Sequence, residues 1–120
     1  MNEIAVTADV ASAGSGANVK MNIAATDLGM QQQADRWMDK LDIFFIQRDD
    51  DGHHAQVDGQ TLGLRLKSST YQSLMPSGVP FEHFVQMRSD MASLRVLVVD
   101  ENSGRMGSVT IPATAMKVGH

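Results

Sequence analysis

Residues 41–48 read LDIFFIQR, and their apolar side chains recur with a period of two. Successive side chains of an extended strand point to opposite faces, so the odd-numbered residues from Leu41 to Phe45 share one face. The opposite face carries Phe44 and Ile46. This period predicts a β-strand that is apolar on both faces rather than a helix.

The same period of two recurs on both sides of this stretch. Turn-forming residues separate most of the alternating segments, among them Asp49–Gly52 and Asp100–Gly104. Short strands with turns between them are typical of an antiparallel sandwich. We expect about seven strands, within residues 3–10, 19–25, 37–48, 57–66, 79–87, 94–99 and 105–112.

One segment departs from this alternation. Within Ser68–Met75, Ser69 is a candidate N-cap for a short helical turn that carries Tyr71. Pro76 and Gly78 follow directly and would end that turn. An α/β fold would need several helices of about 10–15 residues. The sequence therefore predicts an all-β fold with one short helical turn.

Composition and charge exclude several classes of protein. The 120 residues carry a net charge of −4, and the ten Lys and Arg residues are scattered, so nucleic-acid binding is not expected. The chain has no cysteine, which excludes disulfides and thiolate metal sites. No apolar run approaches the ~20 residues that cross a bilayer, so we expect no membrane insertion by this segment. The length suits a single domain over residues 1–120.

Acidic and histidine residues provide two candidate metal sites. Asp49–Gly52, together with Asp39 and Asp58, could form a calcium loop, but the alternating acids of an EF-hand and its closing glutamate are missing. We therefore interpret Asp49–Gly52 as a solvated turn, with a weak Ca²⁺ site as the alternative. Adjacent residues of a strand point to opposite faces, so His53 and His54 cannot both bind one metal ion together with His83. We therefore predict that these histidines lie at the surface and bind no metal. We predict neither a metal nor a cofactor.

The residues of common catalytic sites are absent or isolated. No Gly-x-Ser-x-Gly elbow occurs, and Ser108 lies in a predicted strand. Gly14–Gly16 lacks the lysine of a phosphate-binding loop. Glu82 and Glu101 have no acidic partner in the sequence for paired-carboxylate hydrolysis. The sequence therefore predicts that the chain is not an enzyme and has no catalytic residues.

Several stretches of the chain follow one another in a familiar order. They are Asp35–Trp37, Leu41–Asp49, Leu64–Leu66, Leu94–Asp100 and Ser103–Pro112. Together they resemble the C-terminal region of bacterial proteins described as von Willebrand factor A-related (VWFA-related), over residues 19–113. The resemblance implies an immunoglobulin-like antiparallel β-sandwich that follows an A-type domain in an exported chain. The metal-ion-dependent adhesion site of the A-type domain has no counterpart here, since no Asp-x-Ser-x-Ser sequence occurs.

The resemblance also implies a role and a location. The role is that of a non-catalytic structural or interaction module in an exported bacterial adhesion-type protein. The alternative is a β-sandwich module that binds a carbohydrate or peptide ligand, which would show a row of exposed aromatic side chains. Met1–Val10 lacks the features of a signal peptide, so the chain is either cytoplasmic or a piece whose export signal lies elsewhere. The resemblance favours an extracytoplasmic location, either periplasmic or secreted.

The strands at 41–48 and 94–99 also predict an interaction surface, because both are apolar on both faces. Their inward set is Leu41, Ile43, Phe45, Leu94, Val96 and Val98. The outward set is then Phe44, Ile46, Leu97 and Val99, framed by Asp42, Arg48 and Arg95. If the two strands are neighbours, the outward residues form one apolar patch with a charged rim, which often marks an interface. We expect it to dock a neighbouring domain of the parent chain or a second copy; the alternative is a loop or the N-terminal segment that covers it.

Overall fold

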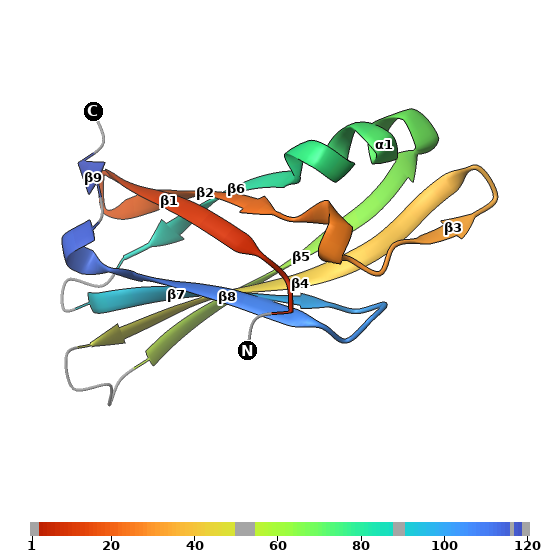
Figure 1. The fold of residues 1–120 in the computed structure, drawn as a ribbon. Coiled ribbons are helices and arrows are strands. Elements are labelled where there is room, and N and C mark those ends of the chain that lie inside the picture. The colour runs from red at the N-terminus through yellow and green to blue at the C-terminus, as the bar shows by residue number, and fades with distance from the viewer. Residues whose placement is uncertain (1–2, 50–54, 88–90, 116, 119–120) are drawn as a thin grey trace.

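The computed structural model describes residues 3–49, 55–87, 91–115 and 117–118 (Figure 1). Within these residues the chain forms nine β-strands, one α-helix and two short 3₁₀ turns. The strands are β1 (Val6–Ala13), β2 (Gly16–Ile23), β3 (Gln31–Gln33), β4 (Arg36–Asp49), β5 (Ala55–Lys67), β6 (Val79–Gln86), β7 (Met91–Asp100), β8 (Met106–Pro112) and β9 (Lys117–Val118). The helix is α1 (Ser68–Ser77), and the 3₁₀ turns are η1 (Ala25–Asp27) and η2 (Ala113–Ala115). The predicted all-β fold is confirmed, and each predicted segment overlaps one strand.

The strands form two sheets that pack as the layers of a sandwich (Figure 1). One sheet has the order β6-β2-β1-β9, in which β9 is parallel to β1 and the other neighbours are antiparallel. In the five-stranded sheet, β5 pairs with β4 from Arg36 to Arg48, so β3 and β7 share the other edge of β4. β8 follows β7. Antiparallel pairing of consecutive strands explains the short turns between them.

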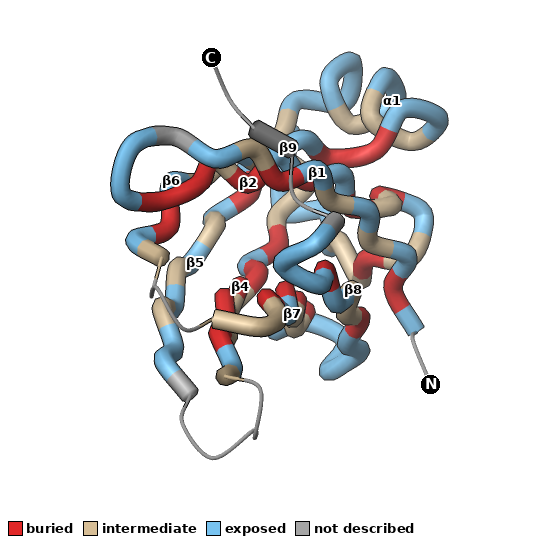
Figure 2. The backbone as a smooth tube through the Cα atoms, turned by 90° about the vertical axis from the view of Figure 1, so that its left-hand side faces the viewer, coloured by how far each residue is buried: buried red, intermediate tan, exposed pale blue. Residues whose placement is uncertain are grey.

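The core lies between the facing sides of the two sheets (Figure 2). All six residues predicted to face inward from β4 and β7 are fully buried. The four-stranded sheet contributes Val19, Ile23 and Val85 among others. Each such side chain stabilises the folded state by about 1.5–3 kcal/mol through removal of apolar surface from water. Alternation along the strands therefore identified the inner face correctly.

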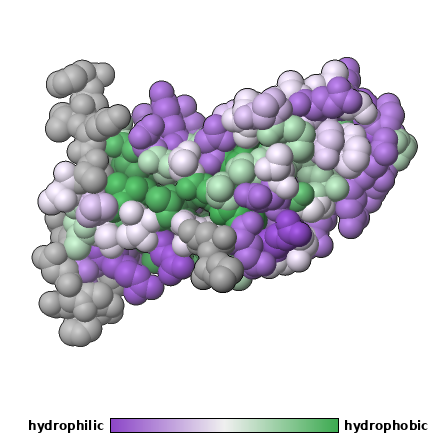
Figure 3. All heavy atoms as spheres, in the orientation of Figure 1, coloured by the Kyte–Doolittle hydropathy of each residue, from purple (hydrophilic) through white to green (hydrophobic). Residues whose placement is uncertain are grey.

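The N-terminal segment closes the sandwich beside β8. Figure 3 shows apolar residues gathered in a band between the two layers on the side where β1 and β8 face each other. Ile4 is fully buried in the core, and the Glu3 amide donates a hydrogen bond of 2.9 Å to the Met106 carbonyl. A Cβ atom at Gly107 would collide with the Ile4 backbone, so glycine is required for this close approach.

The helix α1 is longer than the predicted turn, and its ends differ from the prediction. Lys67 occupies the N-cap position and no side chain caps the helix, so the expectation that Ser69 caps it was wrong. Pro76 lies inside the last turn, where it removes a single hydrogen bond, and the helix ends at Gly78. Gly78 has a φ of 85° and its amide donates to the Leu74 carbonyl, a C-terminal geometry that glycine adopts readily. The helix packs against β4, β5 and η1.

Candidate interaction surface

The outer face of the five-stranded sheet brings the predicted patch together. β4 and β7 are hydrogen-bonded neighbours, and their register places Phe44 directly opposite Leu97. Ile46 and Val99 lie one row to either side, opposite Arg95 and Asp42 respectively. All four apolar residues are half-buried and lie on the face turned away from the core. The predicted adjacency of the two strands is thus confirmed.

The two flanking strands extend the patch with residues that the sequence prediction missed. Val57 on β5 lies opposite Ile46, and Met106 on β8 lies opposite Val99. These two side chains are 59% and 45% exposed. Six residues therefore form an apolar strip across four strands, defined as Val57, Ile46, Phe44, Leu97, Val99 and Met106. Val57 and Met106 each lie in an alternating segment, but only the register of the sheet shows that they adjoin the patch.

A glycine positions the central aromatic ring of the strip. Gly59 on β5 lies opposite Phe44, and a Cβ atom at Gly59 would lie 3.4 Å from a carbon of the Phe44 ring. The ring therefore leans over the β5 backbone, which explains why Phe44 is only half-exposed. Gly63, on the same face of β5, has no atom within 4 Å of its missing Cβ. The outer face of β5 thus has two positions without a side chain: the Phe44 ring covers Gly59, and the space over Gly63 is open.

Charged residues surround the strip, and most of them are basic. The predicted rim residues lie on this face: Arg48 and Arg95 are exposed, and Asp42 accepts a hydrogen bond from the Thr61 hydroxyl at 3.2 Å. Among the described residues, the basic set of this face is Arg36, Lys40, Arg48, Arg65, Lys67 and Arg95, and its acidic set is Asp42, Glu101 and Asp35, which pairs with Arg36. A chain with a net charge of −4 therefore presents a locally positive face.

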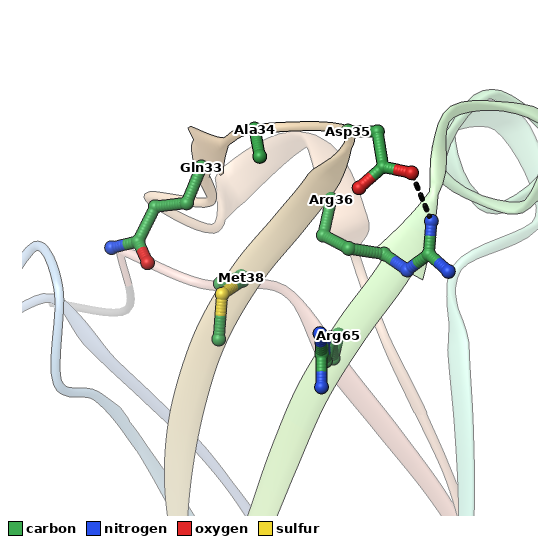
Figure 4. A pocket seen from close by; sticks show the side chains of 6 residues that line it. All are labelled: Gln33, Ala34, Asp35, Arg36, Met38 and Arg65. Carbon is green, nitrogen blue, oxygen red and sulfur yellow. Dashed lines mark hydrogen bonds and ion pairs between the residues drawn. The ribbon is translucent and has the colours of Figure 1, made fainter.

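A shallow hollow of about 380 Å³ lies at the basic end of this face (Figure 4). Figure 4 shows Met38 on β4 beside Arg65 on β5, with Asp35 and Arg36 joined beyond them by an ion pair of 3.0 Å. The β3–β4 turn above the hollow contains Ala34 with a φ of 54°. The hollow is lined by Gln33, Ala34, Asp35, Arg36, Met38 and Arg65. Its lining can accept an anionic side chain better than a cationic one.

The candidate metal ligands do not converge. Asp58 and His83 form a hydrogen-bonded pair of 2.9 Å that joins β5 to β6 across the two sheets, and this contact lowers the pKa of Asp58. His83 also stacks on Phe45 at 4.9 Å between ring centroids. Asp39 lies further along β4, away from this pair. Asp50–Gly52 and His53–His54 lie outside the described residues; within the described part, no three His, Asp or Glu side chains come together.

Asp39 instead belongs to a buried pair of carboxyl groups with Asp100. Asp100 is fully buried and accepts hydrogen bonds from the amide of Gly29 at 2.6 Å, the hydroxyl of Ser103 at 2.7 Å and the amide of Asn102 at 3.1 Å. Asp39 is only 6% exposed, and its Oδ2 atom has no hydrogen-bond partner while Asp39 is ionised. Burial, and then the neighbouring Asp100 carboxyl, raise the pKa of Asp39 to about 7. Sequence reasoning considered Asp39 only as a calcium ligand.

The pKa of Asp100 shifts in the opposite direction from that of Asp39, as expected if the two carboxyl groups share one proton. Burial alone would raise the pKa of Asp100, but the hydrogen bonds from Asp39 and from the surrounding turn outweigh burial and lower it. Below about pH 7, Asp39 is therefore protonated and its O–H can donate to ionised Asp100. The pair anchors the β7–β8 turn to β4 and to the Gly29 segment, and so has a structural role.

The comparisons with known proteins add no relative. No family model matches this chain, and no curated protein or solved structure matches it either. In the described residues, no helix has the length and apolar character needed to cross a membrane.

Proposed function

We propose that this domain is a non-catalytic immunoglobulin-like interaction module that docks a partner through the outer face of its five-stranded sheet. The observation that carries the proposal is the apolar strip, which runs across four strands and has exposed ends at Val57 and Met106. A contiguous apolar patch with a polar rim is a common feature of interaction sites. On docking, the apolar centre of the strip would be buried and its charged rim would stay in contact with water. Interfaces usually have this arrangement.

The division of strands between the sheets supports the immunoglobulin-like assignment. In that fold, strands A, B and E share one sheet, and strands C, F and G share the other. β1, β2 and β6 share one sheet here, and β4, β7 and β8 share the other. The chain order of these six strands is the order A, B, C, E, F, G. β5 then corresponds to the additional strand that variable-type domains add beside strand C.

The resemblance to VWFA-related proteins suggests the context. In that context the domain supports an exported bacterial adhesion-type protein outside the cytoplasm, and the strip docks the neighbouring A-type domain of the parent chain or a second copy. We propose no catalytic role, because the half-buried pair Asp58–His83 and the buried pair Asp39–Asp100 bond to groups of the domain itself. The alternative of a carbohydrate-binding module lacks a supporting observation: among the described aromatic side chains, Trp37 stacks on Tyr71 at 4.0 Å and Phe84 is exposed alone.

Paired serine substitutions test the docking role. The variant Phe44→Ser, Leu97→Ser removes the centre of the strip. Phe84→Ser is the matched control, because Phe84 is 45% exposed on the outer face of the other sheet. Light scattering should show wild-type self-association, or calorimetry should show binding to the parent A-type domain, and either should weaken at least about tenfold in the double variant only. A wild type that is monomeric, is as soluble as the double variant and does not bind the A-type domain would contradict the proposal.

A further inference from the structure

β5 borders the five-stranded sheet, and no described strand pairs with its second edge. β5 pairs with β4 along its length and with no other described strand. Figure 2 shows β5 next to β4 at the border of the lower layer. Among the described residues, no turn, loop or cap backbone hydrogen bond involves residues 57–66; Lys67 is the N-cap of α1, so its carbonyl belongs to the helix. Such an edge is a template for the addition of another strand.

The hydrogen bonds of β4 show which groups of β5 point outward. The carbonyl of Lys40 accepts from the amide of Glu101, at the end of β7, at 2.9 Å. The carbonyl of Met38 accepts from the Asn102 side chain on the same side. Even-numbered residues of β4 therefore direct their backbone groups away from β5, and odd-numbered residues bond to β5, because successive residues of a strand alternate.

The register carries this alternation into β5. Odd-numbered residues of β4 lie opposite even-numbered residues of β5, which are thus the ones bonded in the ladder. The odd-numbered residues of β5 direct their N–H and C=O groups to this second edge. Their side chains lie on the same outer face as the apolar strip. The set is Val57, Gly59, Thr61, Gly63, Arg65 and Lys67.

The outer face along this edge has a definite pattern of shape and charge. The Phe44 ring lies against Gly59 at the edge of β5, and the space over Gly63 is open. Arg65 and Lys67 follow at one end, and both are exposed. Asp58 points to the inner side and is held by His83, so β5 presents no carboxylate on its outer face.

We propose that β5 binds an extended acidic segment of a protein partner as an added antiparallel strand. This inference rests on the proposed function and specifies the partner of the apolar strip. The added strand would continue the strip beyond Val57. Two large apolar side chains of the segment, four residues apart, pack against the Phe44 ring beside Gly59 and into the open space over Gly63. Carboxylates lie opposite Arg65 and Lys67. Main-chain hydrogen bonds provide affinity in this recognition mode, and the alternating side chains provide specificity.

Charge selects this occupant over a second copy. The β5 strand of another molecule carries the same two basic residues and no outward carboxylate, so it offers no acidic partner to Arg65 and Lys67. The antiparallel direction follows the usual preference, because antiparallel ladders are slightly more stable per residue than parallel ones.

The probe is a labelled peptide with the sequence Glu-Thr-Glu-Thr-Phe-Thr-Thr-Thr-Val, which places its residues opposite Lys67 through Gly59 in order. Its control has lysine in place of both glutamates. Fluorescence anisotropy should show saturable binding of the glutamate peptide at low salt and at least about tenfold weaker binding of the lysine peptide. The variant Arg65→Glu should reverse this preference. Amide hydrogen exchange at Gly59, Thr61 and Gly63 should slow when the glutamate peptide binds.

A proline variant separates the edge from the strip. Gly63→Pro removes an outward N–H without loss of a ladder bond, so the domain should fold and lose peptide binding. Leu62→Pro, one residue away, removes a ladder bond and should destabilise the sheet. Absence of saturable peptide binding, or binding that Gly63→Pro leaves unchanged, would overturn strand addition. Strand addition by a partner would also be overturned if the wild type forms a dimer that Gly63→Pro dissociates and that the peptide leaves intact, because the edge would then pair with a second copy. Docking through the strip is measured separately by Phe44→Ser, Leu97→Ser, so the two failures are distinguishable.

Discussion

The substitution Asp39→Asn should stabilise this domain at pH 8. The amide of asparagine has nearly the shape of a protonated carboxyl group, and its N–H can donate to Asp100 at every pH. In the wild type, the proton that makes this contact dissociates with a pKa of about 7, against an ordinary value of 3.8. Ionised Asp39 leaves a buried Oδ2 atom without a partner next to a second carboxylate, which is costly. The variant avoids this cost.

The magnitude follows from the difference between the two pKa values. A shift of about three units corresponds to about 4 kcal/mol at about 1.4 kcal/mol per unit, and Asp39 is buried enough that solvent screening reduces it little. Because the folded-state pKa is raised, the proton stabilises the fold fully below pH ~4, and this contribution is lost as the pH rises to about 7. Asp39→Asn should therefore exceed the wild type by up to about 4 kcal/mol at pH 8 and match it near pH 4.

Urea denaturation followed by the fluorescence of Trp37, the single tryptophan, measures this difference. Asp9→Asn is the matched control, because Asp9 is exposed on the outer face of β1 and its substitution should change stability by less than about 0.5 kcal/mol. An Asp39→Asn variant that is no more stable than the wild type at pH 8 would refute the shared proton. A gain that does not shrink as the pH falls would refute it equally.

Three further outcomes are expected. Leu64→Ala should reduce the free energy of unfolding by about 2–5 kcal/mol through a cavity in the core, whereas exposed Arg65→Ala should change it by less than about 0.5 kcal/mol; equal effects in urea denaturation would mean that the faces of β5 are assigned wrongly. His83→Ala should raise the pKa of Asp58 back toward its ordinary value, so that its carboxyl resonance titrates at higher pH in NMR spectra; an unchanged titration would exclude the hydrogen bond as the cause. Addition of Ca²⁺ or Zn²⁺ should leave the thermal midpoint unchanged, and a saturable rise would reveal a native-state metal site.

Local alternation was sufficient to predict the long strands and their inner faces. β4 and β7 each carry apolar side chains on every second position of the inner face, and the buried set matches this pattern. β3 escaped prediction because Gln31–Gln33 has no apolar residue to alternate; it forms because the turn at Ala34 folds it back onto Arg36–Met38. The length of α1 could not be predicted from its own sequence either, because it depends on packing against β4 and β5 rather than on a capping side chain.

The interaction surface was predicted in part. Phe44 and Leu97 could be assigned to one face from their own strands, but Val57 and Met106 join them only through the register of strands far apart in the sequence. The pairing of the buried Asp39 side chain could not be predicted from the sequence, because its partner Asp100 comes from a distant strand. An isolated acid in the inward positions of β4 was the available signal, since such a position requires a partner or a proton.

The central claim is that the outer face of the five-stranded sheet is covered by a partner. The direct test is the accessibility of the methyl groups of Ile46, Leu97, Val99 and Met106 to a soluble paramagnetic probe, measured by NMR in the isolated domain and in the intact parent protein. The same comparison between dilute and concentrated samples tests a second copy. We expect these methyl groups to become protected, while those of Thr7 and Ala11, on the outer face of the other sheet, do not change. Equal relaxation of the strip methyl groups in all samples would contradict it.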